Sequence, residues 1–174
     1  MKKYSSILLL LLFIFLLCSC GEGSGKMIKF DDSNKKADAR MEQVIEVIKN
    51  KDRNAFREMF SKRALSDSVD FYEKLDALFD YIQGDILSWE RTGTYGGTDE
   101  KNVDGTGNRK KETQSIYVFI TDEQEYEIAI YEFTIDTANS DNVGVYSICV
   151  INKNDKQNPE IRYWGNGDAG INIG

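Results

Sequence analysis

Residues 113–136 read TQSIYVFITDEQEYEIAIYEFTID, which is two runs of β-branched and aromatic residues joined by a short polar connection. Residues of these types favour strands, and so short a connection joins neighbouring antiparallel strands. Similar runs occupy residues 85–92, DILSWERT, and residues 143–152, VGVYSICVIN. We therefore expect a four-stranded antiparallel meander, in which the glycine-rich residues 93–108 form a loop after the first strand.

The two middle strands carry apolar side chains on both faces of this expected sheet. Side chains alternate between the faces of a strand, so Ile116 and Val118 share one face. Tyr117 and Phe119 share the other face. If helices cover one of the faces, we expect a partner subunit, a ligand or the C-terminal tail to cover or use the second.

The residues before the sheet repeat with the helical period. Apolar residues three and four positions apart predict one helix around residues 41–48 and a second that begins after the N-cap residue Asp52. A third helix is expected to begin near Ser66 or Asp67 and to end at Gly84. Because the helices come first and the strands follow, we expect an α+β fold with three helices packed on one face of a curved four-stranded antiparallel sheet.

The amino terminus has the pattern of a secretory signal. Lys2 and Lys3 precede an unbroken apolar run at residues 7–17. This run is too short to span a bilayer stably, because a spanning helix needs about 20 residues. It has the length of the apolar region of a signal peptide.

Two cysteines follow the apolar run, and the size of the preceding residue distinguishes them. The stretch Leu17-Cys18-Ser19-Cys20 resembles the lipobox of bacterial lipoproteins, in which a small residue precedes the acylated cysteine. Ser19 before Cys20 is small, whereas Leu17 before Cys18 is bulky. We expect Cys20 to be the lipid anchor and residues 1–19 to be the lipoprotein signal peptide; the alternative is an uncleaved signal anchor with two incidental cysteines.

These boundaries predict the organisation of the whole chain. Residues 20–35 are expected to form a flexible tether, and residues 36–174 a single α+β domain on the extracytoplasmic side of the cell membrane. Cys149 is then the one thiol left, so we expect it to be a buried small hydrophobe with no internal disulfide.

The composition narrows the classes of function. The sequence has 29 acidic and 22 basic residues, a formal net charge of −7 and no histidine. The acidic balance argues against a nucleic-acid partner, which requires a basic stripe. The absence of histidine excludes Ser-His-Asp and Cys-His catalysis and histidine metal ligands, so we expect no cofactor and no metal site.

Two local matches to ligand-binding motifs lack the context that they require. Gly165, Gly167 and Gly170 match a dinucleotide fingerprint, but no helix can follow them as the fingerprint demands. Residues 100–111 loosely resemble a calcium loop, but Lys111 stands where such a loop needs a bidentate glutamate. We expect neither site to form.

The segment VIEVIKNKDRNAFREMFSKRA, residues 44–64, resembles the opening helices of the cystatin-like, nuclear-transport-factor-like cone fold. Residues 36–170 are also similar to a family of uncharacterised lipoproteins from low-GC Gram-positive bacteria, mainly through this segment and VGVYSICVIN. The resemblance implies a cone with a pocket between sheet and helices, often dimerisation through the sheet, and no particular activity. Enzymes of the wider fold often use a His-Asp pair, which this sequence cannot supply.

Aromatic residues on the strands supply the candidate site, because Tyr and Trp combine apolar area with a polar group. Glu132, between Tyr131 and Phe133, is the acid expected near such a surface, where it would orient a ligand or act as a base. Core packing of the aromatics and a solvent-facing position for Glu132 are the alternatives. The candidate pocket or interface residues are Trp89, Tyr117, Tyr131, Glu132, Tyr146 and Trp164.

These observations together predict a membrane-anchored, extracytoplasmic binding module without enzymatic activity. Its cone or its aromatic sheet face would bind a small ligand, a peptide or an envelope protein. A small enzyme that uses a carboxylate and a tyrosine in the cone pocket is one alternative, and a structural role through homodimerisation is another. A closed apolar pocket with a buried acid would favour a small ligand or an enzyme, and a flat aromatic face would favour a protein partner.

Overall fold

The computed structural model describes residues 33–94, 97–103, 105–154 and 168–174. The expected signal peptide, Cys20, most of the expected tether and Trp164 lie outside these residues. Within the described part of the chain, no helix is long and apolar enough to cross a membrane.

Helices precede strands, so the α+β class is confirmed, but the described residues form four helices where three were expected. They are α2 (Ser33–Asn50), α3 (Arg53–Glu58), α4 (Lys62–Asp67) and α5 (Phe71–Tyr81). The first helix is longer than the apolar repeat indicated, and it begins at Ser33, inside the segment assigned to the tether. The expected N-cap is present, because Asp52 Oδ1 accepts bonds from the amides of Asn54 at 3.1 Å and Ala55 at 3.0 Å.

The second expected helix is divided into α3 and α4 by a contact with the sheet. The Ser61 amide donates to the Val145 carbonyl at 2.9 Å, and the Val145 amide donates to the Met59 carbonyl at 3.0 Å. Ser61 then caps α4 by accepting from the Ala64 amide at 3.0 Å. The third expected helix starts at Phe71, not at Ser66 or Asp67, because α4 ends at Asp67 and a turn separates the two helices.

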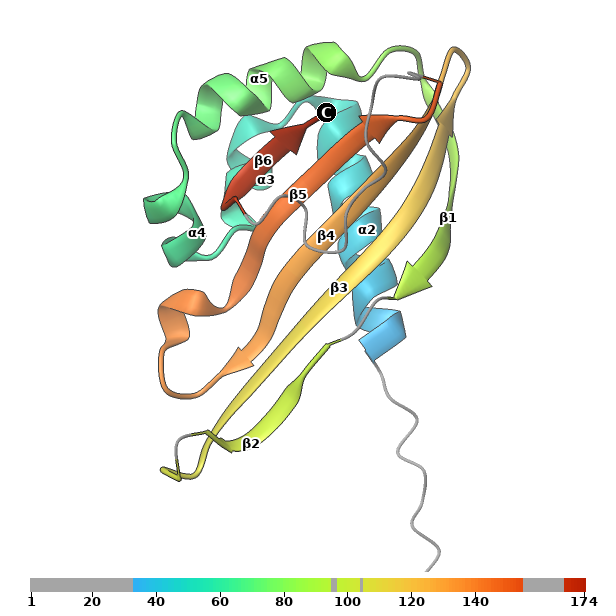
Figure 1. Ribbon diagram of the computed structural model, residues 1–174. Coiled ribbons are helices and arrows are strands. Elements are labelled where there is room, and N and C mark those ends of the chain that lie inside the picture. The colour runs from blue at the N-terminus through green and yellow to red at the C-terminus, as the bar shows by residue number, and fades with distance from the viewer. Residues whose placement is uncertain (1–32, 95–96, 104, 155–167) are drawn as a thin grey trace, which may run out of the picture. The chain divides into compact units, whose positions relative to one another are not determined.

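The strands form one open sheet in which β3, β4 and β5 make the expected antiparallel meander (Figure 1). The order along the sheet is β1-β3-β4-β5-β6, and β2 also pairs with β3. The six strands are β1 (Ile86–Thr94), β2 (Asp99–Val103), β3 (Asn108–Thr121), β4 (Glu125–Asp136), β5 (Gly144–Asn152) and β6 (Gly170–Ile173).

The expected four-stranded, fully antiparallel sheet is therefore wrong in two places. Strand β2 lies in the segment expected to be a loop, and its two acidic residues, Asp99 and Glu100, face lysines on β3. Arg109 donates two bonds of 2.7 Å to the Asp99 carboxylate. Strand β6 lies in the expected tail and pairs with β5 in the parallel direction.

The helices pack on one face of the sheet, and α2 lies behind β3 and β4 in Figure 1. The fully buried side chains of this layer come from both helices and strands, and they include Met41, Val44, Phe56, Leu75, Leu78, Tyr117, Phe119, Tyr126, Ile128, Ile148 and Ile171. Burial of these apolar side chains is the main favourable contribution to folding.

The opposite face of the sheet holds a second, smaller buried cluster. It consists of Ile116, Ala129, Cys149 and Ile151, whose strand neighbours belong to the helix-facing layer. Cys149 is a free, buried cysteine, and burial followed by the charge of Glu127 raises the pKa of its thiol to about 11. Both faces of the sheet thus carry buried apolar side chains.

Candidate functional site

Trp89 and Tyr117 meet on the helix-facing side of the sheet. Their rings make an edge-to-face contact with centroids 5.6 Å apart. Tyr117 is fully buried, and its hydroxyl donates to Asp38 Oδ1 on α2 at 3.3 Å. Burial, followed by the negative charge of Asp38, raises the pKa of Tyr117 above its usual value, so the phenol remains a proton donor at neutral pH.

Glu132 also faces the helices, and it is buried. Its Oε2 atom lies 3.1 Å from Nε of Arg40 on α2, and Arg40 Nη1 donates to Gln43 Oε1 at 2.7 Å. The carboxylate is therefore matched by a guanidinium that is itself held in place. This ion pair joins α2 to β4, and the predicted solvent-facing alternative for Glu132 is wrong.

Arg91 completes a polar cluster between α2 and the sheet. Its Nε atom lies 3.6 Å from Asp38 Oδ1, so this carboxylate faces both Arg91 and the hydroxyl of Tyr117. The buried Nη1 atom of Arg91 has no hydrogen-bond partner among the residues that the structure describes. The Asp38 carboxylate in this cluster is bound by other side chains of the domain. Such an arrangement is typical of a structural contact, here between α2 and the sheet.

Tyr131 and Tyr146 belong to a different cluster, because Tyr131 follows the helix-facing Ile130 and points to the other face of β4. The pairing between β4 and β5 shifts by one residue beside Tyr131, which leaves Tyr146 at a bulge. Its ring lies 5.9 Å from that of Tyr131 and 6.1 Å from that of Phe133.

Two cations and one acid surround this aromatic cluster of Tyr131, Phe133 and Tyr146. The guanidinium of Arg63 lies 5.9 Å from the Tyr146 ring centre, and Lys110 Nζ lies 4.9 Å from that of Phe133. The Tyr131 hydroxyl forms a 2.7 Å bond with Glu112 Oε2, and burial followed by this bond raises the pKa of Tyr131.

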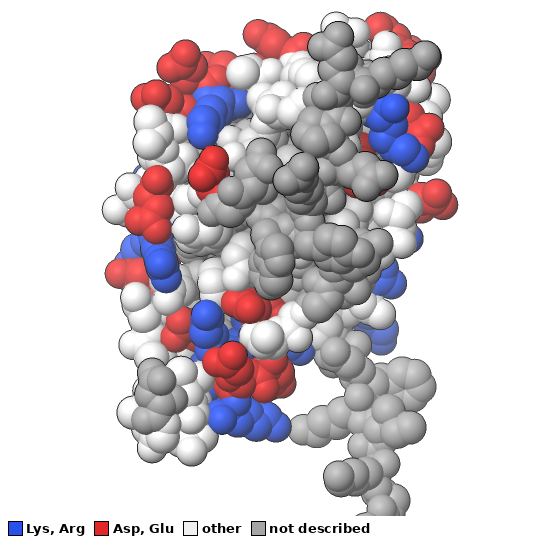
Figure 2. Space-filling model, in the orientation of Figure 1, with Lys and Arg blue, Asp and Glu red and all other residues white. Residues whose placement is uncertain are grey.

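The six predicted site residues therefore do not form one site. Trp89, Tyr117 and Glu132 lie on the helix-facing side, whereas Tyr131 and Tyr146 form the aromatic cluster, and Trp164 is outside the described residues. Binding of a second copy or an envelope protein through the aromatic cluster stays a prediction. On the face that Figure 2 shows, acidic and basic side chains are interspersed, without a broad basic patch among the described residues.

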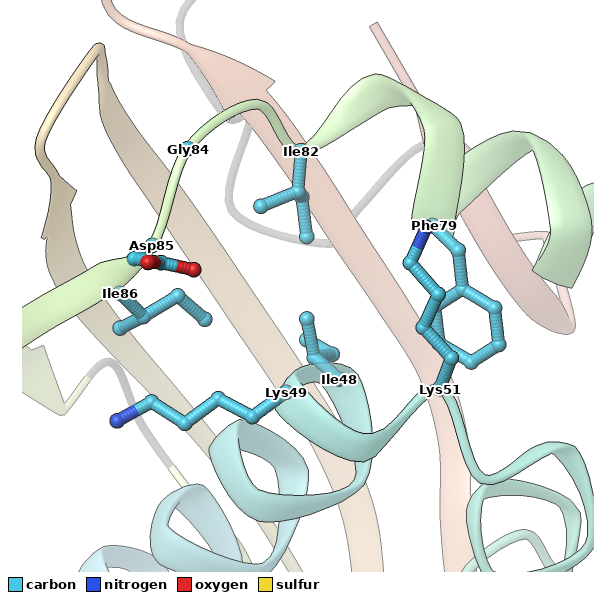
Figure 3. Close-up of a pocket in the computed structure, with 8 residues that line it drawn as sticks. All are labelled: Ile48, Lys49, Lys51, Phe79, Ile82, Gly84, Asp85 and Ile86. Atoms are coloured by element: carbon cyan, nitrogen blue, oxygen red, sulfur yellow. The ribbon is translucent and has the colours of Figure 1, made fainter.

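A pocket lies at the other end of α2, where the helix end approaches α5 and the start of β1 (Figure 3). Its volume is 340 Å³, which is in the range of small-molecule sites. We name it the α2–α5 pocket; its lining residues are Ile48, Lys49, Lys51, Phe79, Ile82, Gly84, Asp85 and Ile86.

The α2–α5 pocket has apolar walls and charged residues at its edges. Ile48 and Ile82 point toward each other across the hollow, from α2 and from the end of α5 respectively. Lys49 and Asp85 lie on the side of Ile86 in Figure 3, and Lys51 and Phe79 lie on the other side. The three charged residues are exposed.

Two backbone turns with positive φ shape this pocket. Gly84 has φ 81°, and an added Cβ there would lie 2.3 Å from Asp122 Oδ1, so a larger residue would be strained and would have to displace the carboxylate that accepts from the Asp85 amide. Lys51 has φ 49°, and the turn that it makes is closed by bonds from its own amide to Ile48 O at 3.1 Å and from the Asp52 amide to Val47 O at 3.0 Å.

The sequence did not predict this pocket, because its walls have the apolar period of a core-facing helix. Phe79 and Ile82 belong to the same stripe as the fully buried Leu75 and Leu78. One signal was available, namely a lysine at the helix end where glycine is the usual residue.

Among the described residues, no group of three or more His, Cys, Asp or Glu side chains is placed to hold a metal ion. A comparison with curated proteins finds no match to the chain. The family model described as "Domain of unknown function (DUF5104)" matches residues 43–153, more than half of the sequence, and the chain therefore belongs to this family.

Proposed function

We propose that this chain is a non-enzymatic binding module, anchored on the extracytoplasmic side of the cell membrane by a lipid on Cys20, that binds a small ligand in the α2–α5 pocket. The pocket is the observation that carries the binding role. It has a volume of 340 Å³ and a lining in which apolar residues alternate with charged ones, and its volume is in the range of small-molecule sites. The lipobox-like residues before Cys20 support the anchor.

The groups best suited to catalysis are bound to other side chains of the same domain, which supports a binding role over an enzymatic one. The Glu132 carboxylate faces Arg40, and the Asp38 carboxylate faces Arg91 and Tyr117. Because the pKa of Tyr117 is raised, its phenol is no base near neutral pH. A carboxylate and tyrosine enzyme would need one of these groups free to meet a substrate.

We also propose that the domain adopts the cystatin-like, nuclear-transport-factor-like cone fold and that the protein is one of the envelope lipoproteins. Packing of the long β3–β5 meander on α2 supports the cone. A homodimer or an envelope protein on the aromatic cluster is the proposed macromolecular partner. Three neighbouring rings with two flanking cations support that partner, because aromatic residues and arginine are enriched in protein interfaces.

Cys20→Ala tests the membrane anchor. We expect the wild-type chain to incorporate labelled palmitate in cells and to sediment with membranes, and Cys20→Ala to lose the label and leave the membrane fraction. Cys18→Ala is the matched control and should keep both properties. Acylation or complete membrane retention of the Cys20→Ala chain would contradict the anchor.

Ile82→Trp tests the pocket by filling it. We expect at least one compound in a panel of small carboxylates, amines, alcohols and sugars to raise the melting temperature of the wild type but not of Ile82→Trp. Leu87→Trp is the matched control, because Leu87 is 67% exposed and does not line the pocket. The pocket proposal fails if no compound stabilises the wild type, or if Ile82→Trp responds equally.

A further inference from the structure

Lys51 has a left-handed backbone conformation that is uncommon for lysine. Three described residues other than glycine have positive φ, namely Lys51, Asp70 and Asn102. Asp and Asn adopt this left-handed conformation more readily, because their short polar side chains bond to nearby backbone. Lysine gains no such bond, and glycine is the usual residue at this position after a helix. The cationic side chain suits the negative end of the α2 dipole, and it also places a positive charge at the pocket.

The charges around the α2–α5 pocket leave Lys51 without a counter-charge. Lys49 and Asp85 lie on the same side of the pocket in Figure 3, so this side carries one charge of each sign. Lys51 lies on the other side, as Phe79 does, and none of the salt bridges among the described residues includes it. The nearest acid along the chain, Asp52, is occupied as the N-cap of α3.

We infer that the α2–α5 pocket takes a small amphipathic carboxylate, whose apolar body lies between Ile48 and Ile82 and whose anionic group meets Lys51. This inference rests on the proposed function, because it names the ligand class of the same pocket. Apolar walls suit the body of such a ligand, and the uncompensated ammonium of Lys51 suits its charge. Neutral or cationic ligands with the same body are the competing occupants.

Three probes with one carbon skeleton separate these occupants: 4-methylpentanoate, 4-methylpentan-1-ol and 4-methylpentylamine. Binding to the full chain in phospholipid nanodiscs is measured by ligand-observed NMR titration, with empty nanodiscs as the blank. We expect the carboxylate to bind about two- to fivefold more tightly than the alcohol, the range for one exposed ion pair, and the amine to bind most weakly. Equal binding of the alcohol, or tighter binding of the amine, overturns the anionic class and leaves the pocket in place. If none of the probes binds, the pocket proposal falls with the inference.

Variants of Lys51 separate the charge from the fold. Lys51→Gly and Lys51→Asn remove the charge in residues that accept the left-handed conformation, so we expect loss of the preference for the carboxylate with an unchanged or raised melting temperature. Lys51→Arg should keep the preference, and Lys49→Gln, on the side of Asp85, should change it less than Lys51→Gly does. A Lys51→Gly chain that still prefers the carboxylate overturns the inference.

Discussion

At the scale of single residues, Tyr117 connects the two layers of the domain through one hydroxyl group. Its ring packs against Trp89 within the sheet, and its hydroxyl reaches Asp38 on α2. Alternation along the strand predicted an aromatic residue at this face. It did not predict the partner, because the distance between Asp38 and Tyr117 depends on how α2 lies against the sheet.

We predict that the free energy of unfolding decreases as the pH rises above about 10, the pKa of an unperturbed tyrosine, and that Tyr117→Phe reduces this loss. The pKa of Tyr117 is raised in the folded state, so the unfolded chain loses this proton at a lower pH than the folded chain does. Proton release therefore favours unfolding at high pH, whereas the stabilisation is fully present below pH 10.

Urea unfolding over a pH series from about 8 to about 11 measures this dependence. Tyr131, Tyr126 and Cys149, whose pKa values are also raised, account for part of the loss that Tyr117→Phe leaves, and the Cys149 contribution begins near pH 9, the ordinary pKa of a thiol. Tyr72→Phe, at a tyrosine that is 43% exposed, is the matched control for removing one phenol group. An alkaline loss in Tyr117→Phe as large as in the wild type would contradict the prediction.

At the scale of elements, the sequence predicted a helix boundary correctly where residues close by in the chain determine it. Asp52 caps α3 through amides two and three positions further on, so its role could be inferred from the sequence. The break between α3 and α4 is held by hydrogen bonds to Val145, far away in the chain, and no local pattern indicates it. Strand β2 had a readable signal, because acidic residues 99–100 face basic residues 110–111.

We predict that Gly84→Ala lowers the free energy of unfolding by about 2–3 kcal/mol, through a positive φ and a steric clash. Gly107→Ala is the matched control: Gly107 has φ 80° but no atom within 4 Å of an added side chain. Gly107→Ala should lower the free energy of unfolding by only about 1 kcal/mol, the cost of the positive φ without a clash. Chemical denaturation measures both values, and an equal cost would show that the contact with Asp122 is unimportant.

At the scale of the whole molecule, the layered α+β arrangement was predictable from the order of periodic segments. The strand count was not, because β6 pairs with β5 in parallel across residues that give no local sign of it. Of the candidate site, the shared face of Tyr117 and Phe119 follows from strand alternation, whereas the contact of Tyr117 with Trp89 depends on the register between β1 and β3. The α2–α5 pocket depends on where α2 and α5 end relative to β1, which periodicity does not determine.

The two layers are also held together by the ion pair between Arg40 and Glu132, which are 92 residues apart. We predict that Arg40→Leu lowers the free energy of unfolding by about 2–3 kcal/mol, because it leaves a buried carboxylate unpaired. Glu132→Leu should cost less, since the Arg40 side chain is 25% exposed and can reach water.

The double variant Arg40→Leu/Glu132→Leu tests the coupling. With both charges gone, two apolar side chains face each other, so we expect most of the Arg40→Leu loss to be recovered. Urea unfolding of the wild type, both single variants and the double variant gives the coupling energy. Simple additivity of the two losses would mean that the ion pair does not join the layers.

The burial of Cys149 has a practical consequence for following motions of the domain. Its thiol is 7% exposed, and its raised pKa keeps it in the unreactive protonated form. A thiol-specific reagent can therefore react only when the sheet face around Ile116 and Ala129 opens. The rate of that reaction would therefore report how often local fluctuations expose Cys149, without any added probe group.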